Sequence, residues 1–195
     1  MTLKVSAMNL ALEDKRVLVN LARRAIRDIL DGKSFDEIDE GSLPENLKVD
    51  KGVFVTLYKN HELRGCLGYV LPLIPLWRAT LENACNAAFR DHRFEPLHEN
   101  EYDDVTIEIS VLNELEKIKD VHKYRVGTHG IILKKGLHVA VILPQVPLRN
   151  GWNALETLRH LSEKAGLEPG GWKESDSLEI FTAEVFSESE LVPAG

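Results

Sequence analysis

Hydrophobic positions near the start of the chain follow a helical spacing and then an alternating one. From Glu13 to Leu30, apolar residues recur every three or four positions and leave arginines on the opposite side. This pattern predicts an amphipathic helix that ends at Asp31-Gly32. The segments Gly52–Lys59 and Glu62–Val70 alternate apolar and polar positions around Asn60-His61. Alternation on both sides of a short turn predicts a β-hairpin.

A second helix and a third strand follow. Pro75 can begin a helix, because the first turn does not need its missing N–H, and small residues such as Ala84, Ala87 and Ala88 then form its inner face. Val105–Val111 alternates most clearly, with its apolar residues on one side and Thr106, Glu108 and Ser110 on the other. We expect a strand with one dry face and one polar face.

The remaining elements are a hairpin, a helix and a last strand. They are predicted at Gly130–Lys134 with Leu137–Leu143, from the Asn153 capping box to Ala165, and at Leu178–Phe186, with a loop over Pro144–Gly151. Strands occur in hairpins and do not alternate singly with helices, so the pattern favours an α+β fold. We expect a mainly antiparallel or mixed β-sheet flanked by helices.

Length and composition allow one sizeable domain or two small ones that share a core. The chain has 195 residues, 44% of them hydrophobic, which is enough to fill one sizeable core. We expect one domain over residues 1–195, with its core at about 12–186. Long connections on both sides of the Val105 strand would allow a larger and a smaller lobe.

Charge and cysteine content narrow the possible binding partners and the cellular compartment of the protein. A formal charge of -7 argues against non-specific binding to nucleic acid or to an anionic membrane. Met1–Asp14 lacks a secretory signal, and the apolar stretch Tyr69–Trp77 is short and broken by prolines. Cys66 and Cys85 are too few for a disulfide framework. We therefore expect a cytoplasmic protein that does not enter a membrane.

Candidate chemistry begins in the predicted strand Glu62–Val70. Strand pleating places Arg64, Cys66 and Gly68 on one face, so a guanidinium lies near a thiol and the glycine leaves space for a ligand. A nearby cation favours the reactive thiolate. The alternative is that Cys66 is a small buried hydrophobe and Arg64 a surface ion-pair partner.

Three further segments offer polar groups to such a site. Asp91 and Arg93 follow a helix end closely, where they either bind an anion or a proton, or simply form surface ion pairs. Glu108 either points toward Arg64 or Cys66 or belongs to a solvated sheet face. Gln145 follows a strand and can present an amide, although a plain loop is equally consistent with its sequence.

Familiar cofactor and metal motifs are absent from the sequence. It contains no phosphate-binding glycine loop, no His-Glu-x-x-His, no Cys-x-x-Cys and no Gly-x-Ser-x-Gly. We expect no dedicated metal site, and the sequence leaves any cofactor unknown.

Five motifs follow one another along the chain: Leu63–Gly68, Asp91–Leu97, Ile107–Leu112, Leu143–Val146 and Lys164–Leu167. In this order they resemble the AMMECR domain family, whose bacterial and archaeal members are known as AmmeMemoRadiSam system protein A. The similarity extends from the first helix to about Phe186. The chain differs from the family at His92, where proline is common, and at Ser162, where cysteine is common.

The resemblance implies an α+β fold with two lobes and a cleft beside the Arg-Gly-Cys strand. It also implies a Memo-type protein and a radical S-adenosylmethionine enzyme as partners. It adds weight to one shared site without assigning a reaction. The expected catalytic residues are Cys66, Asp91 and Glu108, and the expected substrate-binding residues are Arg64, Gly65, Gly68, Arg93, Ser110 and Gln145.

Two functions are consistent with these residues. The first is a cysteine-dependent enzyme in which the Cys66 thiolate attacks a small anionic substrate, which Arg64 and Arg93 hold. The second is a non-catalytic binding module for a nucleotide, a nucleic acid or a peptide, in which the arginines matter and the thiol does not.

Overall fold

The computed structural model describes residues 9–34 and 38–191. Met1–Asp14, the segment in which a secretory signal would lie, is therefore partly outside the described residues. The chain divides into two compact units, and each has its own sheet and its own hydrophobic core. The first unit consists of the residues up to Leu112 together with those from Glu184 onward, and the second unit is Asn113–Ala183.

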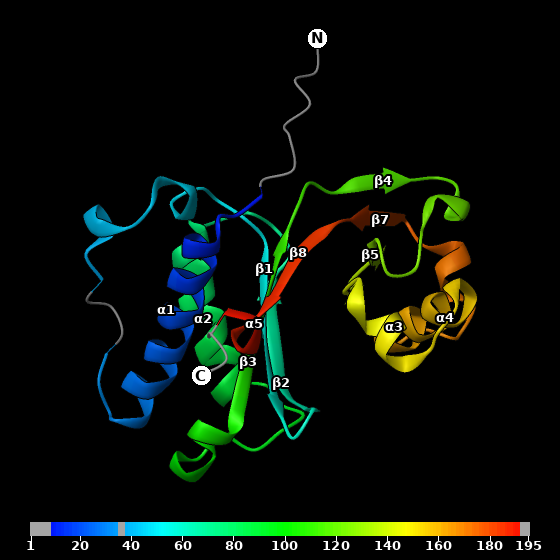
Figure 1. Cartoon of the computed structure of the whole chain (residues 1–195). Helices are drawn as coiled ribbons and strands as arrows, with labels where there is room; N and C mark the ends of the chain where they lie inside the picture. The colour runs from blue at the N-terminus through cyan, green and yellow to red at the C-terminus, as the bar shows by residue number, and fades with distance from the viewer. Residues whose placement is uncertain (1–8, 35–37, 192–195) are drawn as a thin grey trace. The chain divides into compact units, whose positions relative to one another are not determined.

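The first unit is a four-stranded antiparallel sheet with helices on one face (Figure 1). The strand order is β2-β1-β3-β8, and β1 pairs with both β2 and β3. The helices are α1 (Leu12–Leu30) and α2 (Leu76–Phe89). The strands are β1 (Val53–Lys59), β2 (Glu62–Tyr69), β3 (Val105–Leu112) and β8 (Ala183–Ser187), and the short helices are η1 (Glu40–Ser42), η2 (Glu45–Leu47), η3 (Glu99–Asp104) and α5 (Glu188–Leu191).

The core of this unit follows the predicted alternation. Val53, Val55 and Leu57 of β1 are fully buried and pack with the apolar faces of α1 and α2. The predicted inner face of α2 is buried along its whole length, and its alanines allow β2 and α2 to approach closely. The hairpin turn at Asn60 and His61 adopts positive φ values of 52° and 67°, which the two-residue turn of a hairpin requires.

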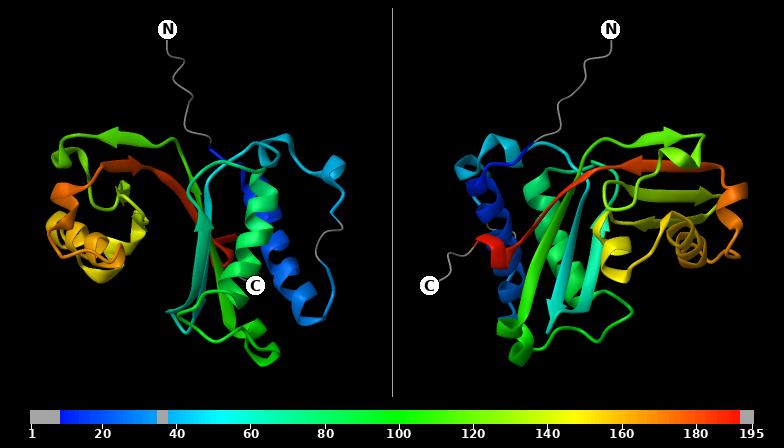
Figure 2. Two further views of the ribbon diagram at one scale, coloured as in Figure 1. Left: turned by 180° about the vertical axis from the view of Figure 1, so that it is seen from behind. Right: turned by 45° about the vertical axis from the view of Figure 1, so that its right-hand side comes forward.

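The second unit repeats this plan with a separate sheet (Figure 2). The strand order is β4-β7-β5-β6, again antiparallel, and α4 packs on β5 and β6. The predicted capping box is present, since Asn153 and Glu156 exchange hydrogen bonds of 2.8 and 3.0 Å. The elements are β4 (Glu116–Ile118), η4 (Val121–Lys123), β5 (Gly130–Lys135), β6 (His138–Ile142), α3 (Gln145–Asn150), α4 (Ala154–Lys164), η5 (Gly171–Glu174) and β7 (Ser177–Phe181).

The predicted α+β class is confirmed, with two antiparallel sheets in place of one divided sheet. The prediction of one strand over Leu178–Phe186 is wrong, because this segment is divided at Thr182 into β7 and β8, which belong to different sheets. Asn113 donates to Thr182 through both its backbone and its side-chain amide at 2.9 Å and so holds the chain where it changes sheet. The predicted loop Pro144–Gly151 contains the short helix α3.

Among residues 9–34 and 38–191, no helix has both the length and the apolar character needed to cross a bilayer. The single domain over 1–195 and the cleft between its lobes stay predictions.

Candidate functional site

The candidate site in the first unit begins with one row of side chains across three strands. Thr56 of β1 pairs directly with Cys66 of β2 and with Glu108 of β3. Residues opposite each other in neighbouring strands point to the same face. Since Val55 and Leu57 face the helices, this row lies on the sheet face away from α1 and α2. The sheet therefore brings a thiol, a hydroxyl and a carboxyl group into line.

This polar row is not a solvated surface. Thr56 and Glu108 are 3% and 5% exposed, Ser110 is fully buried, and Cys66 is half-buried. The alternative that β3 has a plain wet face is therefore wrong. Burying a polar side chain costs free energy unless the side chain has a hydrogen-bond partner. The presence of these polar groups inside the unit therefore needs a specific reason.

Thr56 is the one member of the row that was not predicted as a site residue. Its hydroxyl donates to Cys66 Sγ at 3.2 Å, so it contacts the candidate nucleophile directly. The signal in the sequence was its place at a polar position of a strand whose other face is Val53, Val55 and Leu57. Recognising it required the pairing of β1 with β2.

Asp91 and Arg93 hold the backbone of Cys66 from the loop after α2. Asp91 Oδ2 accepts from the Cys66 amide at 2.9 Å, and Arg93 Nη2 donates to the Cys66 carbonyl at 3.2 Å. The two side chains also bind each other, with Arg93 Nε donating to Oδ1 at 2.9 Å and Nη2 donating to Oδ2 at 2.6 Å. The structure therefore brings Cys66, Asp91 and Arg93 together.

Asp91 is an ionised carboxylate with its acceptor positions filled. Its side chain is 2% exposed, and burial pushes its pKa upward, but the bonds from Arg93 and from the Cys66 amide outweigh that cost and hold the pKa at about 2. A carboxylate with so low a pKa is a poor proton acceptor at neutral pH. Its contacts therefore make it a positioning group for Cys66 and Arg93.

Arg93 is a cation in direct contact with Cys66, through the bond from its Nη2 to the Cys66 carbonyl. Its side chain is 41% exposed, and its Nη1 has no hydrogen-bond acceptor in the described part of the chain. The bonds to Asp91 raise the pKa of Arg93, and Cys66 acts in the same direction. Arg93 can therefore present one edge of its guanidinium to an anion while Asp91 holds the other.

Arg64 does not accompany Cys66 as pleating predicted. A bulge between Leu57 and Tyr58 leaves Arg64 without a directly opposed residue in β1 and breaks the two-residue alternation there. Its guanidinium turns to Glu101 of η3 and forms a double contact, Nε to Oε1 at 3.1 Å and Nη2 to Oε2 at 2.9 Å. The expected thiol–Arg64 pair is thus replaced by a pair with Glu101.

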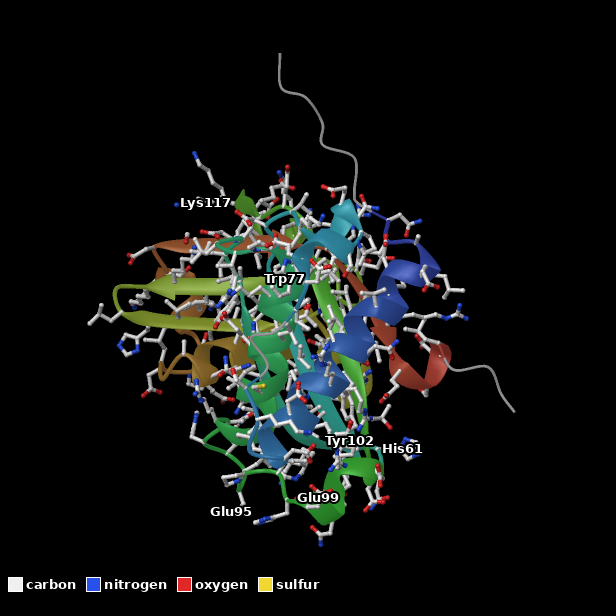
Figure 3. All side chains as sticks on the ribbon, turned by 90° about the vertical axis from the view of Figure 1, so that its left-hand side faces the viewer. His61, Trp77, Glu95, Glu99, Tyr102 and Lys117 are labelled. Carbon is white, nitrogen blue, oxygen red and sulfur yellow. The ribbon has the colours of Figure 1, made fainter. Side chains whose placement is uncertain are left out.

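The Arg64–Glu101 pair lies at the end of the unit where η3 begins, which Figure 3 marks by the labelled Glu99 and Tyr102. The bond from Arg64, against the cost of burial, holds the pKa of Glu101 at about 2, and Lys59 adds a further contact at 3.1 Å. Such a pair orders the η3 segment beside β2.

Both predicted ligand-binding glycines are in contact with protein atoms. A Cβ on Gly65 would lie 2.1 Å from the Ala87 carbonyl oxygen of α2, so Gly65 allows the strand and the helix to touch. A Cβ on Gly68 would lie 2.3 Å from the ring of Phe54, its partner in β1. The space that was expected for a ligand at Gly68 is occupied by this ring.

The remaining predicted residues lie in different places. Ser110 shares the polar face of β3 with Glu108 but pairs with Phe54 and not with Thr56.

Gln145 belongs to the second unit, where it begins α3, and its part in a shared site stays a prediction. Ser162 is fully buried in α4, where it donates to the Leu158 carbonyl and accepts from the Trp172 amide, both at 3.0 Å. In the described residues no group of three or more His, Cys, Asp or Glu side chains is arranged to hold a metal ion.

Comparison with known proteins assigns the chain to a family. The AMMECR1 family model matches residues 19–186. A Methanopyrus kandleri protein is 41% identical over 191 residues, covering 93% of this chain and 91% of its own, and an Aquifex aeolicus protein is 40% identical over 185 residues, covering 91% and 94%. The crystal structure of an uncharacterized protein from Pyrococcus horikoshii superposes with a TM-score of 0.85 at 39% identity, covering 90% of this chain and 92% of that one. The chain therefore belongs to the AMMECR1 family.

Proposed function

We propose that the protein is a cysteine-dependent enzyme that acts on a small anionic substrate. The observation that carries this proposal is the environment of Cys66. Its sulfur accepts a hydrogen bond from Thr56, and its backbone is held on both sides by the Asp91–Arg93 pair. A fixed thiol beside a partly exposed guanidinium is the arrangement that nucleophilic attack on an anionic substrate requires.

The row across the sheet supports the ionised form of the thiol. Thr56 is paired with both Cys66 and Glu108, and its hydroxyl donates to Cys66 Sγ. In the proposed step the thiol gives its proton to a water molecule, and the hydrogen bond from Thr56 stabilises the resulting thiolate. The sulfur then forms a bond to an electrophilic carbon, and the electron pair displaced from that carbon goes to its oxygen or to the leaving group.

The contacts divide the arginines between two roles. Arg93 holds the anionic group of the substrate through Nη1, while its other edge stays on Asp91. Arg64 keeps the η3 segment in place through Glu101. This differs from the expectation that both arginines bind substrate, and it makes the proposal testable by comparing them.

Alkylation with two matched reagents tests the proposal. Iodoacetate and iodoacetamide share a leaving group and differ in charge, and both form a C–S bond with release of iodide. The background variant Cys85→Ala leaves Cys66 as the single cysteine of the chain. We expect the rate ratio of iodoacetate to iodoacetamide to exceed that of a free model thiol by about tenfold, as for one charge-assisted contact.

Two variants separate the arginines. Arg93→Gln should reduce the ratio to that of the model thiol, whereas Arg64→Gln should leave the ratio unchanged, because its guanidinium is bound to Glu101. Thr56→Val should slow both reagents equally. A Cys66 that reacts no faster with the anionic reagent than a model thiol does, or that does not react, would remove the basis for an enzyme with a thiol nucleophile.

We also propose the cytoplasm as the setting and a Memo-type protein and a radical S-adenosylmethionine enzyme as partners. Both cysteines are free thiols, which fits a reducing compartment, and the partners follow from the family resemblance. Affinity purification of the tagged chain from its own cells, followed by mass spectrometry, tests the partners. Their absence from the purified material under mild salt would count against this part of the proposal.

A further inference from the structure

The first unit contains a hollow whose lining does not include Cys66. It has a volume of about 360 Å³ and lies where Tyr69 of β2, Ile29 of α1 and one side of α2 meet. Tyr69 packs against the helical core, whereas Cys66, three residues earlier in the strand, belongs to the opposite face. The hollow is therefore separate from the site proposed above, and its size falls in the range of small-molecule pockets.

Most of the polar groups around the hollow compensate one another. Glu82 accepts from the Tyr69 hydroxyl at 3.0 Å and from Arg78 Nε at 3.1 Å, so its charge is balanced by Arg78. Burial, more than any other cause, raises the pKa of Cys85 to about 12, so this thiol is neutral under physiological conditions. These groups leave no negative charge without a partner.

Arg90 is different, because its guanidinium forms no ion pair with any carboxylate of the described residues. Its Nη1 donates to the Asn86 amide oxygen at 3.4 Å. Arg90 lines the hollow together with Cys85 and Tyr69. The hollow thus has a cation that no described carboxylate pairs with, next to a neutral thiol and a neutral phenol.

The other walls are apolar. Ile29 is 38% exposed, which is unusual for a residue at an inward-turned position of a helix, and Phe89 packs at the edge of the core beside it. Figure 3 looks onto this side of the unit, with Trp77 near the start of α2. A cation that no carboxylate of the described residues pairs with, beside apolar side chains, matches a molecule with an apolar body and a single negative charge.

We infer that this hollow is a second ligand site and that it takes a small carboxylic acid with an aromatic or aliphatic body. Arg90 binds the carboxylate with a guanidinium oriented by Asn86, and Ile29 and Phe89 contact the apolar body. Arg90 can match one negative charge, and Arg78 is already paired with Glu82, so the site favours a monoanion over a dianion.

Titration of the full chain with 3-phenylpropionate tests this site. Nitrogen-15 NMR at neutral pH should show saturable shifts at the amides of α2, of the end of β2 and of the end of α1. The neutral 3-phenylpropionamide serves as a matched probe and should bind at least about tenfold more weakly, as expected for loss of one charge-assisted pair. Cys66→Ser should bind the acid as the wild type does, because the two sites are separate.

Three substitutions are expected to change the affinity for 3-phenylpropionate in different ways. Arg90→Gln should weaken binding of 3-phenylpropionate by about tenfold. Glu82→Gln should strengthen it, because the substitution leaves Arg78 as a second cation at the hollow without its carboxylate partner. Arg125→Gln, which changes an exposed arginine of the second unit, should leave it unchanged. Equal binding of acid and amide, an unchanged affinity in Arg90→Gln, or shifts confined to other elements would overturn the inference.

Discussion

The hydrogen bonds that Asp91 accepts explain its role at the site better than its position after the predicted helix does. Its two oxygens accept from the Cys66 amide, from the Arg93 amide at 3.2 Å and from two Arg93 side-chain nitrogens. A buried carboxylate with four donors stabilises the fold only while it is ionised. The same bonds fix the residue that carries the thiol.

The ionisation of Asp91 predicts how stability changes with pH. Its pKa is about 2 in the folded protein, against an ordinary value of 3.8, so folding lowers it. A lowered carboxylate pKa contributes stability that is fully present above about pH 4 and is lost as the pH falls through about 2, an effect on the order of 2 kcal/mol.

Urea unfolding of Asp91→Asn should show this loss. At pH 7 we expect the variant to be less stable than the wild type by about 2 to 3 kcal/mol, and the difference should shrink as the pH falls toward 2. Asp103→Asn, which changes an exposed aspartate, is the control and should behave as the wild type does. A difference that stays constant from pH 7 to pH 2 would show that the charge of Asp91 is not the stabilising feature.

At the scale of elements, the position of β2 against α2 depends on Gly65. The strand lies at the edge of the first sheet, and its backbone meets the carbonyl of Ala87 where any Cβ would collide. The neighbouring bulge turns Arg64 out of the alternation and toward η3. The local course of β2 therefore decides which side chains reach Cys66.

Gly65→Ala should destabilise the protein strongly, because backbone atoms at 2.1 Å cannot move aside cheaply. We expect a loss of about 2 to 3 kcal/mol in the free energy of unfolding. Gly170→Ala is the matched control, since its added Cβ meets no atom within 4 Å and its φ is −95°, and it should change stability by less than about 0.5 kcal/mol. Equal stability of both variants would mean that β2 and α2 can separate without cost.

At the scale of the whole molecule, the second unit is continuous in sequence and the first is not. All four strands of the second sheet and its apolar core lie between Asn113 and Ala183, whereas the first sheet needs β8 from the end of the chain. The two halves of the predicted last strand complete different sheets.

This difference predicts that residues 113–183 fold when expressed alone. The fragment contains every partner of Ile131, Leu133 and Leu161 in its core, so it should give dispersed amide signals and one cooperative thermal transition. A fragment ending at Leu112 lacks β8 and α5, and it should unfold at a lower temperature than the same fragment joined to residues 184–195. A fragment 113–183 with an unfolded spectrum would show that its core depends on the other unit.

The sequence by itself determined the family and several of the elements, because these depend on local information. Periodicity predicted α1, the β1–β2 hairpin, α2, β3 and α4, and the dry faces of β1 and β3 followed from alternation. The same alternation identified Cys66 and Glu108 as residues of the face turned from the helices. Motifs in order were sufficient to recognise the family.

Tertiary structure alone decided which groups meet. Strand register placed Thr56 between Cys66 and Glu108, a bulge sent Arg64 to Glu101, and the loop after α2 brought Arg93 to the Cys66 backbone in its place. The division of the last strand at Thr182 likewise depends on a contact with Asn113. Periodicity reports the direction of a side chain within one element, whereas pairing, bulges and sheet changes depend on contacts between residues far apart in the chain.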